Sequence, residues 1–217
     1  EYGLVENALD SLREAMNYYN EGDEEDNANQ YKFSILLSAH CVELLLKEIL
    51  RRNHPALLFE NIDSVKDLQD DDNQTVGYKN AIQRVKKLCG VDLKQYETYI
   101  DELGRVRNQI QHYKCSINGE YHKQLMAKTF SAIEFIFRDI LGLKFEDYEN
   151  IIEPADIDFL HEYIAANKAR KKDIVKDFEK SENRFRIEYV DGKYLEVCCP
   201  HCGTESLALE SNGYIKC

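Results

Sequence analysis

The sequence predicts a mainly α-helical protein, an antiparallel helical bundle followed by a small β-rich module. Two observations predict the bundle: apolar residues recur at helical spacing over residues 1–145, and the 217-residue chain contains only 3 Pro and 10 Gly. A third observation predicts the module, because short runs of β-branched and aromatic residues alternate with turn residues near the end. We therefore divide the chain into a helical domain (1–145), a helical extension or linker (146–185) and a β-rich module (186–217).

The helical domain contains five predicted helices. They are expected from Leu4 to an acidic loop at 21–26, and at about 29–52, 75–88, 93–114 and 120–141. The second is apolar nearly all round, which is typical of the central, most buried member of a bundle. Gly90 is well placed to cap the third helix, Asn118-Gly119 marks a tight turn between the last two, and Gly142 is expected to end the last.

The extension carries signals for one more helix. Pro154 with Asp156 behind it favours a helix start, and apolar residues continue from Ile157 to Phe178. The basic residues in the middle of this helix are interpreted as a solvated face.

Charge and hydropathy limit the classes of function. The formal net charge is −12, so the chain has no basic surface of the kind that coats nucleic acid, and any such contact must use a local basic site. No apolar run is long enough for a membrane helix, and the first residues lack the pattern of a signal peptide. We therefore expect a cytoplasmic protein without membrane contact. Because the sequence starts at Glu1 and stops on a cysteine, we also expect it to be a fragment of a longer polypeptide.

The candidate catalytic residues lie on the predicted helix 93–114. Successive helix positions turn by about 100°, so spacing predicts which side chains share a face. The face that packs into the bundle is expected to consist of Leu103, Val106, Ile110 and Tyr113. The neighbouring exposed stripe is expected to consist of Arg105, Asn108 and His112, with Arg107 and Gln111 on its flank. A cation, an amide and an imidazole therefore share one side, and the helix dipole favours a protonated imidazole near this C-terminal end.

These groups suit RNA cleavage without a metal. The ribose 2′-OH must lose a proton to attack the phosphate, the leaving 5′-oxygen must gain one, and a guanidinium stabilises the charge on the phosphate oxygens. One helix supplies one His112, but two protomers meeting across a two-fold axis would supply both an acid and a base. Such a dimer would also concentrate Arg105, Arg107 and Lys114 around one cleft. The alternative is an exposed Arg/His face without chemistry.

The run Arg107-Asn108-Gln-Ile-Gln-His112, an R-x4-H motif, follows an earlier apolar helix that contains Glu43. In this position it resembles the HEPN superfamily, over about residues 1–145. The resemblance implies a helical bundle that dimerises and acts as a metal-independent endoribonuclease in toxin–antitoxin, abortive-infection or other antiviral systems. It implies that Arg107 and His112 are catalytic, that Asn108 shapes the site and that Glu43 is the polar residue of the long second helix. The stricter toxin branch has a Tyr two residues after the His, whereas Tyr113 here follows directly.

Three further residues are expected to bind substrate, and one carboxylate needs a partner. The expected substrate-binding residues are Arg105, Tyr113 and Lys114. Glu43 lies in an apolar run, and an unpaired buried carboxylate is costly. It either forms a simple salt bridge with Lys47, one turn on, or orients Arg107 or His112; His40 lies one turn back. His122 is expected to be an exposed residue at a helix start.

The last cysteines predict a structural zinc site. Cys199-Pro-His-Cys202-Gly is typical of the first knuckle of a zinc ribbon, and Cys217 follows a predicted β-hairpin, as a third ligand should. A fourth ligand is missing; Cys198 or His201 are alternatives, although adjacent residues chelate one metal poorly. We expect structural Zn²⁺ in a truncated module and no metal in catalysis.

The sequence thus predicts a dimeric HEPN-type endoribonuclease with a zinc-ribbon-like tail, acting on RNA in antiviral defence or a toxin–antitoxin system. A protein antitoxin or a larger defence complex is an expected partner. The alternative is a non-catalytic HEPN-like module that binds a nucleotide or a protein. A further alternative is a regulatory subunit that the ribbon targets to a larger complex.

Overall fold

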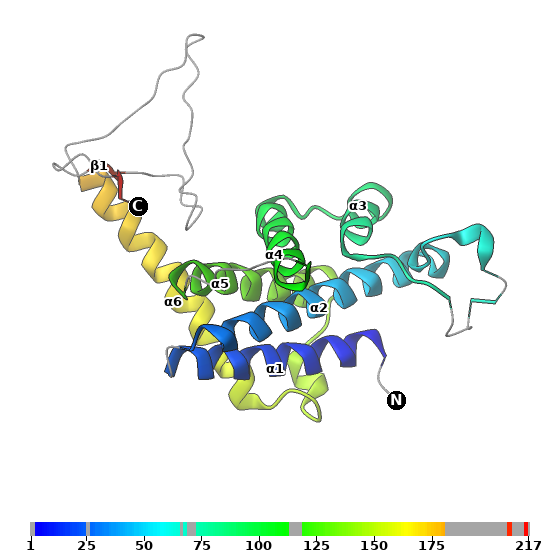
Figure 1. The fold of residues 1–217 in the computed structure, drawn as a ribbon, viewed down its shortest axis with the longest axis horizontal. Coiled ribbons are helices and arrows are strands. Elements are labelled where there is room, and N and C mark those ends of the chain that lie inside the picture. Colours follow the sequence, from blue (N-terminus) through cyan, green and yellow to red (C-terminus); the bar gives the residue numbers. More distant parts are fainter. Residues whose placement is uncertain are drawn as a thin grey trace, which may run out of the picture. The chain divides into compact units, whose positions relative to one another are not determined.

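A computed structural model describes residues 3–24, 27–65, 67–68, 73–112, 119–180, 208–209 and 215–216. The chain divides into two compact units, Glu1–Leu160 and His161–Cys217. The described part is mainly helical, as the sequence predicts. Figure 1 shows the fold of the first unit, which contains the candidate catalytic helix.

Helices α1 (Leu4–Glu24) and α2 (Ala28–Asn53) run side by side in opposite directions (Figure 1). The apolar stripe of α1 is buried, including Leu9 and Leu12, because it faces α2 and the rest of the core. Asn27 begins α2 by accepting a hydrogen bond from the backbone N–H of Asn29. The expected acidic loop at 21–26 is wrong in part, since α1 continues to Glu24.

Helix α2 is central, as predicted, because it packs against α1, α3, α4 and α5. Two 3₁₀ turns, η1 (Pro55–Leu58) and η2 (Ile62–Ser64), follow it, and an isolated antiparallel bridge joins Phe59 to Thr75. Helix α3 (Tyr78–Leu88) comes next. Gly90 follows α3 with a φ of +66°, which a residue with a side chain rarely adopts, and this confirms its predicted place after the helix.

Helices α4 (Lys94–His112) and α5 (Gly119–Phe135) pack against α2 and against each other. The predicted helix 120–141 is not uniform: after Phe135 it becomes a π-helical turn, η3 (Ile136–Ile140), and Leu141 N–H donates to the Ile136 carbonyl at 2.9 Å. Gly142 has a φ of +65° and ends this segment, as predicted.

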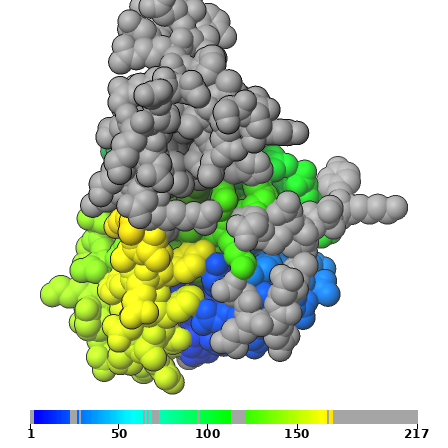
Figure 2. All heavy atoms as spheres, turned by 90° about the vertical axis from the view of Figure 1, so that its left-hand side faces the viewer, coloured from blue at the N-terminus to red at the C-terminus, as the bar shows by residue number. Residues whose placement is uncertain are grey.

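The first unit closes with η4 (Phe145–Tyr148) and the start of α6 (Pro154–Lys180), the additional helix that the sequence predicts. Arg13 of α1 donates to the Ile151 carbonyl at 2.7 Å, and the rings of Tyr19 and Phe159 lie 6.5 Å apart. These contacts tie the start of α6 and the segment before it to α1. In Figure 2 the start of α6 is yellow and α1 is dark blue.

The second unit contains the later residues of α6 and an antiparallel pair of short strands, β1 (Ala208–Leu209) and β2 (Ile215–Lys216). Ala208 pairs with Lys216, and Leu209 pairs with Ile215. The predicted zinc ligands Cys199, Cys202 and Cys217 lie outside the described residues. Within the described residues, no helix has both the length and the apolar character to cross a membrane.

Candidate active site

Helix α4 presents the two faces that its spacing predicts. Leu103, Val106 and Ile110 are buried, whereas Asn108 and His112 are exposed. The buried face packs against α2 and α5. This packing fixes the orientation of α4 and keeps the stripe on its solvent side. His112 is the last residue of α4. Tyr113 and Lys114, two of the predicted substrate-binding residues, lie outside the described residues.

Arg107 lies between these two faces and is half-buried. Its Nη1 donates a hydrogen bond to Oδ1 of Asn108 at 3.1 Å. A planar guanidinium held along one edge keeps its other N–H groups in a defined direction. The neighbouring pair of the R-x4-H motif therefore forms one local unit in which Asn108 orients the cation.

His40, Glu43 and Lys47 form a cluster on α2, and the charge of Arg107 also acts on His40. Lys47 Nζ donates to Glu43 Oε1 at 2.8 Å, and both side chains are largely buried. Burial lowers the pKa of His40 below its ordinary value; Glu43 opposes this shift, and the positive charges of Lys47 and Arg107 reinforce it.

The close approach of α3 and α4 depends on Gly104. A Cβ atom at this position would come within 2.7 Å of Cε1 of Tyr78, closer than two carbon atoms can pack. Tyr78 is buried and donates a hydrogen bond from its hydroxyl to the Ile100 carbonyl at 2.9 Å. Burial, with a contribution from nearby Asp101, raises the pKa of Tyr78, so its hydroxyl stays protonated. Tyr78 therefore holds α3 against α4 at Gly104, about one helical turn before Arg107.

Arg105, the third predicted substrate-binding residue, is held by a carboxylate. Its Nε and Nη2 donate to the two oxygens of Glu102 at 2.9 and 2.7 Å, and the Tyr121 hydroxyl donates to the same carboxylate. The hydrogen bond from Arg105 lowers the pKa of Glu102, while burial raises that of Tyr121 to about 12. A phosphate that reaches Arg105 must therefore compete with Glu102 for the guanidinium.

The structure brings some of the predicted residues together and separates others. Arg107 and Asn108 are in contact, and Arg107 and Glu43 both act electrostatically on Tyr78. Arg105 instead faces Glu102 and Tyr121. His112 is five positions after Arg107, which turns it by about 140° around the helix, so the two side chains leave α4 in different directions.

The sequence placed His40 one turn from Glu43 without giving it a role, and it misplaced His122. Spacing shows that His40 shares a helix face with Glu43 and Lys47, but the influence of Arg107 on it acts between helices. His122 is only 2% exposed and lies against the Tyr121 ring, so the expectation of an exposed residue is wrong. Its place on the packed side of α5 explains the burial.

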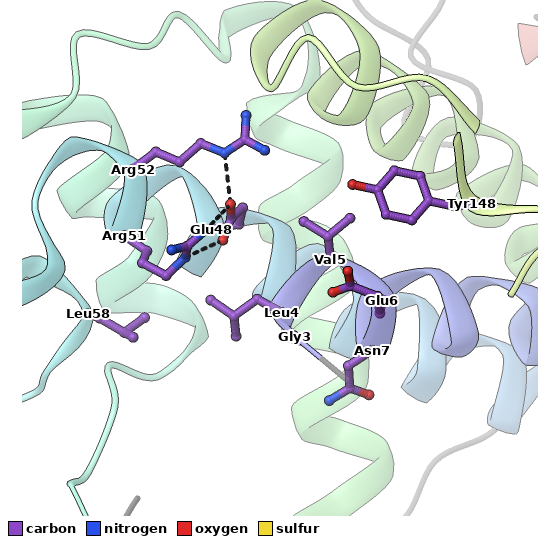
Figure 3. A pocket seen from close by; sticks show the side chains of 10 residues that line it. All are labelled: Gly3, Leu4, Val5, Glu6, Asn7, Glu48, Arg51, Arg52, Leu58 and Tyr148. Carbon is purple, nitrogen blue, oxygen red and sulfur yellow. Dashed lines mark hydrogen bonds and ion pairs between the residues drawn. The ribbon is translucent and has the colours of Figure 1, made fainter. Parts of the chain in front are cut away.

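A hollow of about 640 Å³ lies at the C-terminal end of α2 (Figure 3). Its lining consists of Gly3, Leu4, Val5, Glu6, Asn7, Glu48, Arg51, Arg52, Leu58 and Tyr148. Glu48 is 2% exposed and accepts hydrogen bonds from Arg51 at 2.7 and 2.8 Å and from Arg52 at 2.8 Å. Arg52 also donates to the Leu141 carbonyl at 2.7 Å. Glu6 and Glu48 balance the charges of Arg51 and Arg52 in this lining. The hydrogen bond from Arg52 ties α2 to the end of η3, so we assign the cluster a structural role.

Comparisons of the chain with the known protein families, with curated proteins and with solved structures find no match. Among the described residues, no group of three or more His, Cys, Asp or Glu side chains is arranged to hold a metal ion. The chemistry of the described site is that of an oriented guanidinium, an amide and two imidazoles, groups that bind a phosphate and transfer protons.

Proposed function

We propose that this protein is a metal-independent endoribonuclease of the HEPN type that cleaves RNA at a composite site formed by two protomers. The observation that carries the proposal is the oriented Arg107–Asn108 pair on the helix that ends with the exposed His112. Phosphate recognition needs a guanidinium with a fixed direction, and proton transfer needs an accessible imidazole.

The reaction follows from these groups. A base removes the proton of the ribose 2′-OH, and the 2′-oxygen bonds to the adjacent phosphorus. The bond from phosphorus to the 5′-oxygen breaks, and an imidazolium protonates that oxygen. Arg107 stabilises the negative charge on the non-bridging oxygens. The products are a 2′,3′-cyclic phosphate and a 5′-OH end, and the two His112 residues of a dimer supply the acid and the base.

The charge of the chain bears on how RNA reaches this site. The net charge is −12, but the segment 105–114 contains no acidic residue. An acidic body with a local basic stretch engages RNA weakly, because few counterions are released on binding. Delivery of substrate by a larger cytoplasmic defence complex, and restraint by a protein antitoxin, are consistent with this weak engagement.

The test is RNA cleavage by the purified protein in buffer with EDTA, with His112→Ala and Arg107→Ala beside it. We expect cyclic phosphate ends from the wild type and a loss of about 10²- to 10⁴-fold in either variant, the usual contribution of one proton-transfer group. His54→Asn is the matched control, because it removes a histidine that caps η1 at the far end of α2 and keeps a capping oxygen.

Equal cleavage by the wild type and His112→Ala, or no cleavage by any of them, would contradict the proposal. Reactions without EDTA run in parallel, since a chelator can unfold a zinc module. Tight binding of a nucleotide or of a basic protein without cleavage would instead favour a non-catalytic regulatory module, for which the net charge of −12 is a point in favour.

We also propose that Cys199, Cys202 and Cys217 bind a structural Zn²⁺ ion. Thiolates are the ligands that structural zinc prefers, and Cys217 directly follows β2. Metal analysis of the purified protein should find one zinc per chain, and Cys202→Ser should lower this content. Full zinc in the double variant Cys199→Ser/Cys202→Ser would exclude this ligand set.

A further inference from the structure

A hydrogen-bonded network joins α4 to α5 at Arg105. The Nε and Nη2 atoms of Arg105 donate to the two carboxylate oxygens of Glu102 at 2.9 and 2.7 Å, and Nη2 also donates to the Tyr121 hydroxyl at 3.3 Å. The Tyr121 hydroxyl donates in turn to Glu102. Because Tyr121 belongs to α5 and the other two residues to α4, the network fixes the direction of the guanidinium relative to both helices.

This network leaves the faces of the guanidinium to solvent. Hydrogen bonds from an arginine leave in the plane of the group, so Glu102 and Tyr121 bind along its edge and do not cover its faces. In spite of these two partners, the side chain of Arg105 is 53% exposed. Tyr121 is half-buried, and its ring meets the ring of His122 edge to face, with the centroids 5.2 Å apart. A flat cation held beside an aromatic side chain is the kind of surface on which a nucleobase stacks.

Arg105 and His112 share the exposed stripe of α4. Their separation of seven positions turns the two side chains apart by only about 20° around the helix and places them about 10 Å apart along its axis. An RNA strand whose scissile phosphate lies at His112 can therefore bring a neighbouring nucleotide to Arg105. The phosphate of that nucleotide would meet the negative charge of Glu102, whereas its base is uncharged and flat.

We propose that Arg105, oriented by Glu102 and Tyr121, binds the base of a nucleotide beside the scissile phosphate by stacking, and so positions the RNA for cleavage. The inference rests on the proposed endoribonuclease function and changes the role of Arg105 from a phosphate ligand to a base ligand. The nucleotide at this position must be unpaired, because a base inside a duplex is already stacked between its neighbours. Stacking accepts every base, so this contact positions the strand without reading its sequence.

The experiment compares the wild type with Arg105→Lys on single-stranded RNA and on the same RNA with one nucleotide at a time deprived of its base. Lysine keeps the charge and loses the plane. On ordinary RNA we expect Arg105→Lys to raise KM about tenfold, the usual contribution of one stacked base, with little change in kcat. At one position the missing base should raise KM of the wild type by the same factor, and on that RNA the two proteins should be equal.

Two further variants complete the test. Arg138→Lys is the matched control, because Arg138 is 50% exposed and pairs with Glu134 on its own helix at 3.6 Å; it should keep the wild-type KM on both RNAs. Glu102→Gln removes the charge that orients Arg105. If Arg105 stacks on a base, this variant should weaken the binding of ordinary RNA more than that of the abasic RNA. Tighter binding of both RNAs would show that the released guanidinium holds a phosphate, and would overturn the proposal.

The outcomes separate the inference from the proposed function. If the wild type cleaves but Arg105→Lys keeps the wild-type KM, or weakens ordinary and abasic RNA equally, only the stacking role fails. If the wild type cleaves nothing, fluorescence anisotropy with 2′-O-methyl RNA measures binding alone. The same dependence on the base and on Arg105 would then support the stacking role without the cleavage, and its absence would contradict both. A partly unfolded variant would lower kcat and leave KM unchanged, so misfolding does not imitate the expected result.

Discussion

Two carboxylates on α2, little more than one turn apart, have different surroundings. Glu48 is almost completely buried, and two arginines surround it, one of which also binds the Leu141 carbonyl. Among the described residues, Glu43 accepts a hydrogen bond from Lys47, and its charge acts on His40, one turn back. The first carboxylate is saturated with donors, whereas the second keeps acceptor capacity close to an imidazole.

The difference shows that the hydrogen-bond partners of a buried carboxylate indicate whether its role is structural. A carboxylate that three hydrogen bonds satisfy, and one of whose partners also binds the backbone, holds elements together. Glu43, whose partner is one flexible lysine, contributes less to holding elements together. We therefore expect changes at Glu48 to act on stability and changes at Glu43 to act on activity.

The largest effect is expected from Glu48→Ala. The substitution removes the hydrogen bonds from Arg51 and Arg52 and leaves an internal gap, at a cost of about 3 kcal/mol in the free energy of unfolding. Both arginines are partly exposed and can regain water, which keeps the cost below that of an isolated buried charge. Urea unfolding measures it, and Glu149→Ala, an exposed carboxylate, is the control. A change below about 0.5 kcal/mol, as at ordinary surface sites, would show that the cluster is not structural.

Glu43→Gln should reduce activity more than stability, the reverse of Glu48→Ala. We expect a loss of about tenfold in RNA cleavage, or about 1.4 kcal/mol in transition-state stabilisation, and less than 1 kcal/mol in stability. Lys47→Met removes the same ion pair from the other side. If both variants lose only stability and cleave normally, Glu43 is a simple salt-bridge partner. Glu43 and Glu48 would then both have structural roles.

The same pair should shift the pKa of His40 in opposite directions. Glu43 raises the pKa of His40 and Lys47 lowers it. Glu43→Gln should therefore lower the pKa of His40, and Lys47→Met should raise it. NMR titration of the His40 ring between pH 4.5 and pH 8, a range of roughly two units about the ordinary histidine value, measures the shift. Shifts in the same direction, or none, would mean that the Glu43–Lys47 pair does not act on His40.

The smallest effect is expected on stability in acid. Burial alone would raise the pKa of Glu48, but the hydrogen bonds from Arg51 and Arg52 outweigh it and the net pKa is lowered. A lowered folded-state pKa contributes stability above the unfolded value of 4.5, and this contribution is lost as the pH falls through the folded value. The free energy of unfolding of Glu48→Gln should thus decline less steeply than that of the wild type below pH 4.5. Identical slopes would place the acid sensitivity elsewhere.

Much of the helical fold and part of the site were predictable because both rest on periodicity. The buried face of α4, the central place of α2 and the partnership of Glu43 with Lys47 all follow from spacing along one helix. The extension of α1 to Glu24 was missed, because the acidic run 21–26 has a loop-like composition, whereas its residues 21–24 continue the helix.

Contacts between helices were not predictable in this way. Nothing local marks Gly104 as the position that the Tyr78 ring approaches, or Arg52 as a donor to Leu141. The burial of His122 and the pairing of Arg105 with Tyr121 likewise depend on which face α5 turns towards α4.

The sequence by itself determined which side chains share a face of a helix, because 3.6 residues complete each turn whatever surrounds the helix. It therefore predicted the exposed stripe of α4. Only the tertiary structure decided which helices meet, because that depends on how all the apolar faces pack at once. Packing lets the charge of Arg107 act on His40 and encloses Glu48 between two arginines, and so it separates a candidate catalytic carboxylate from a structural one on the same helix.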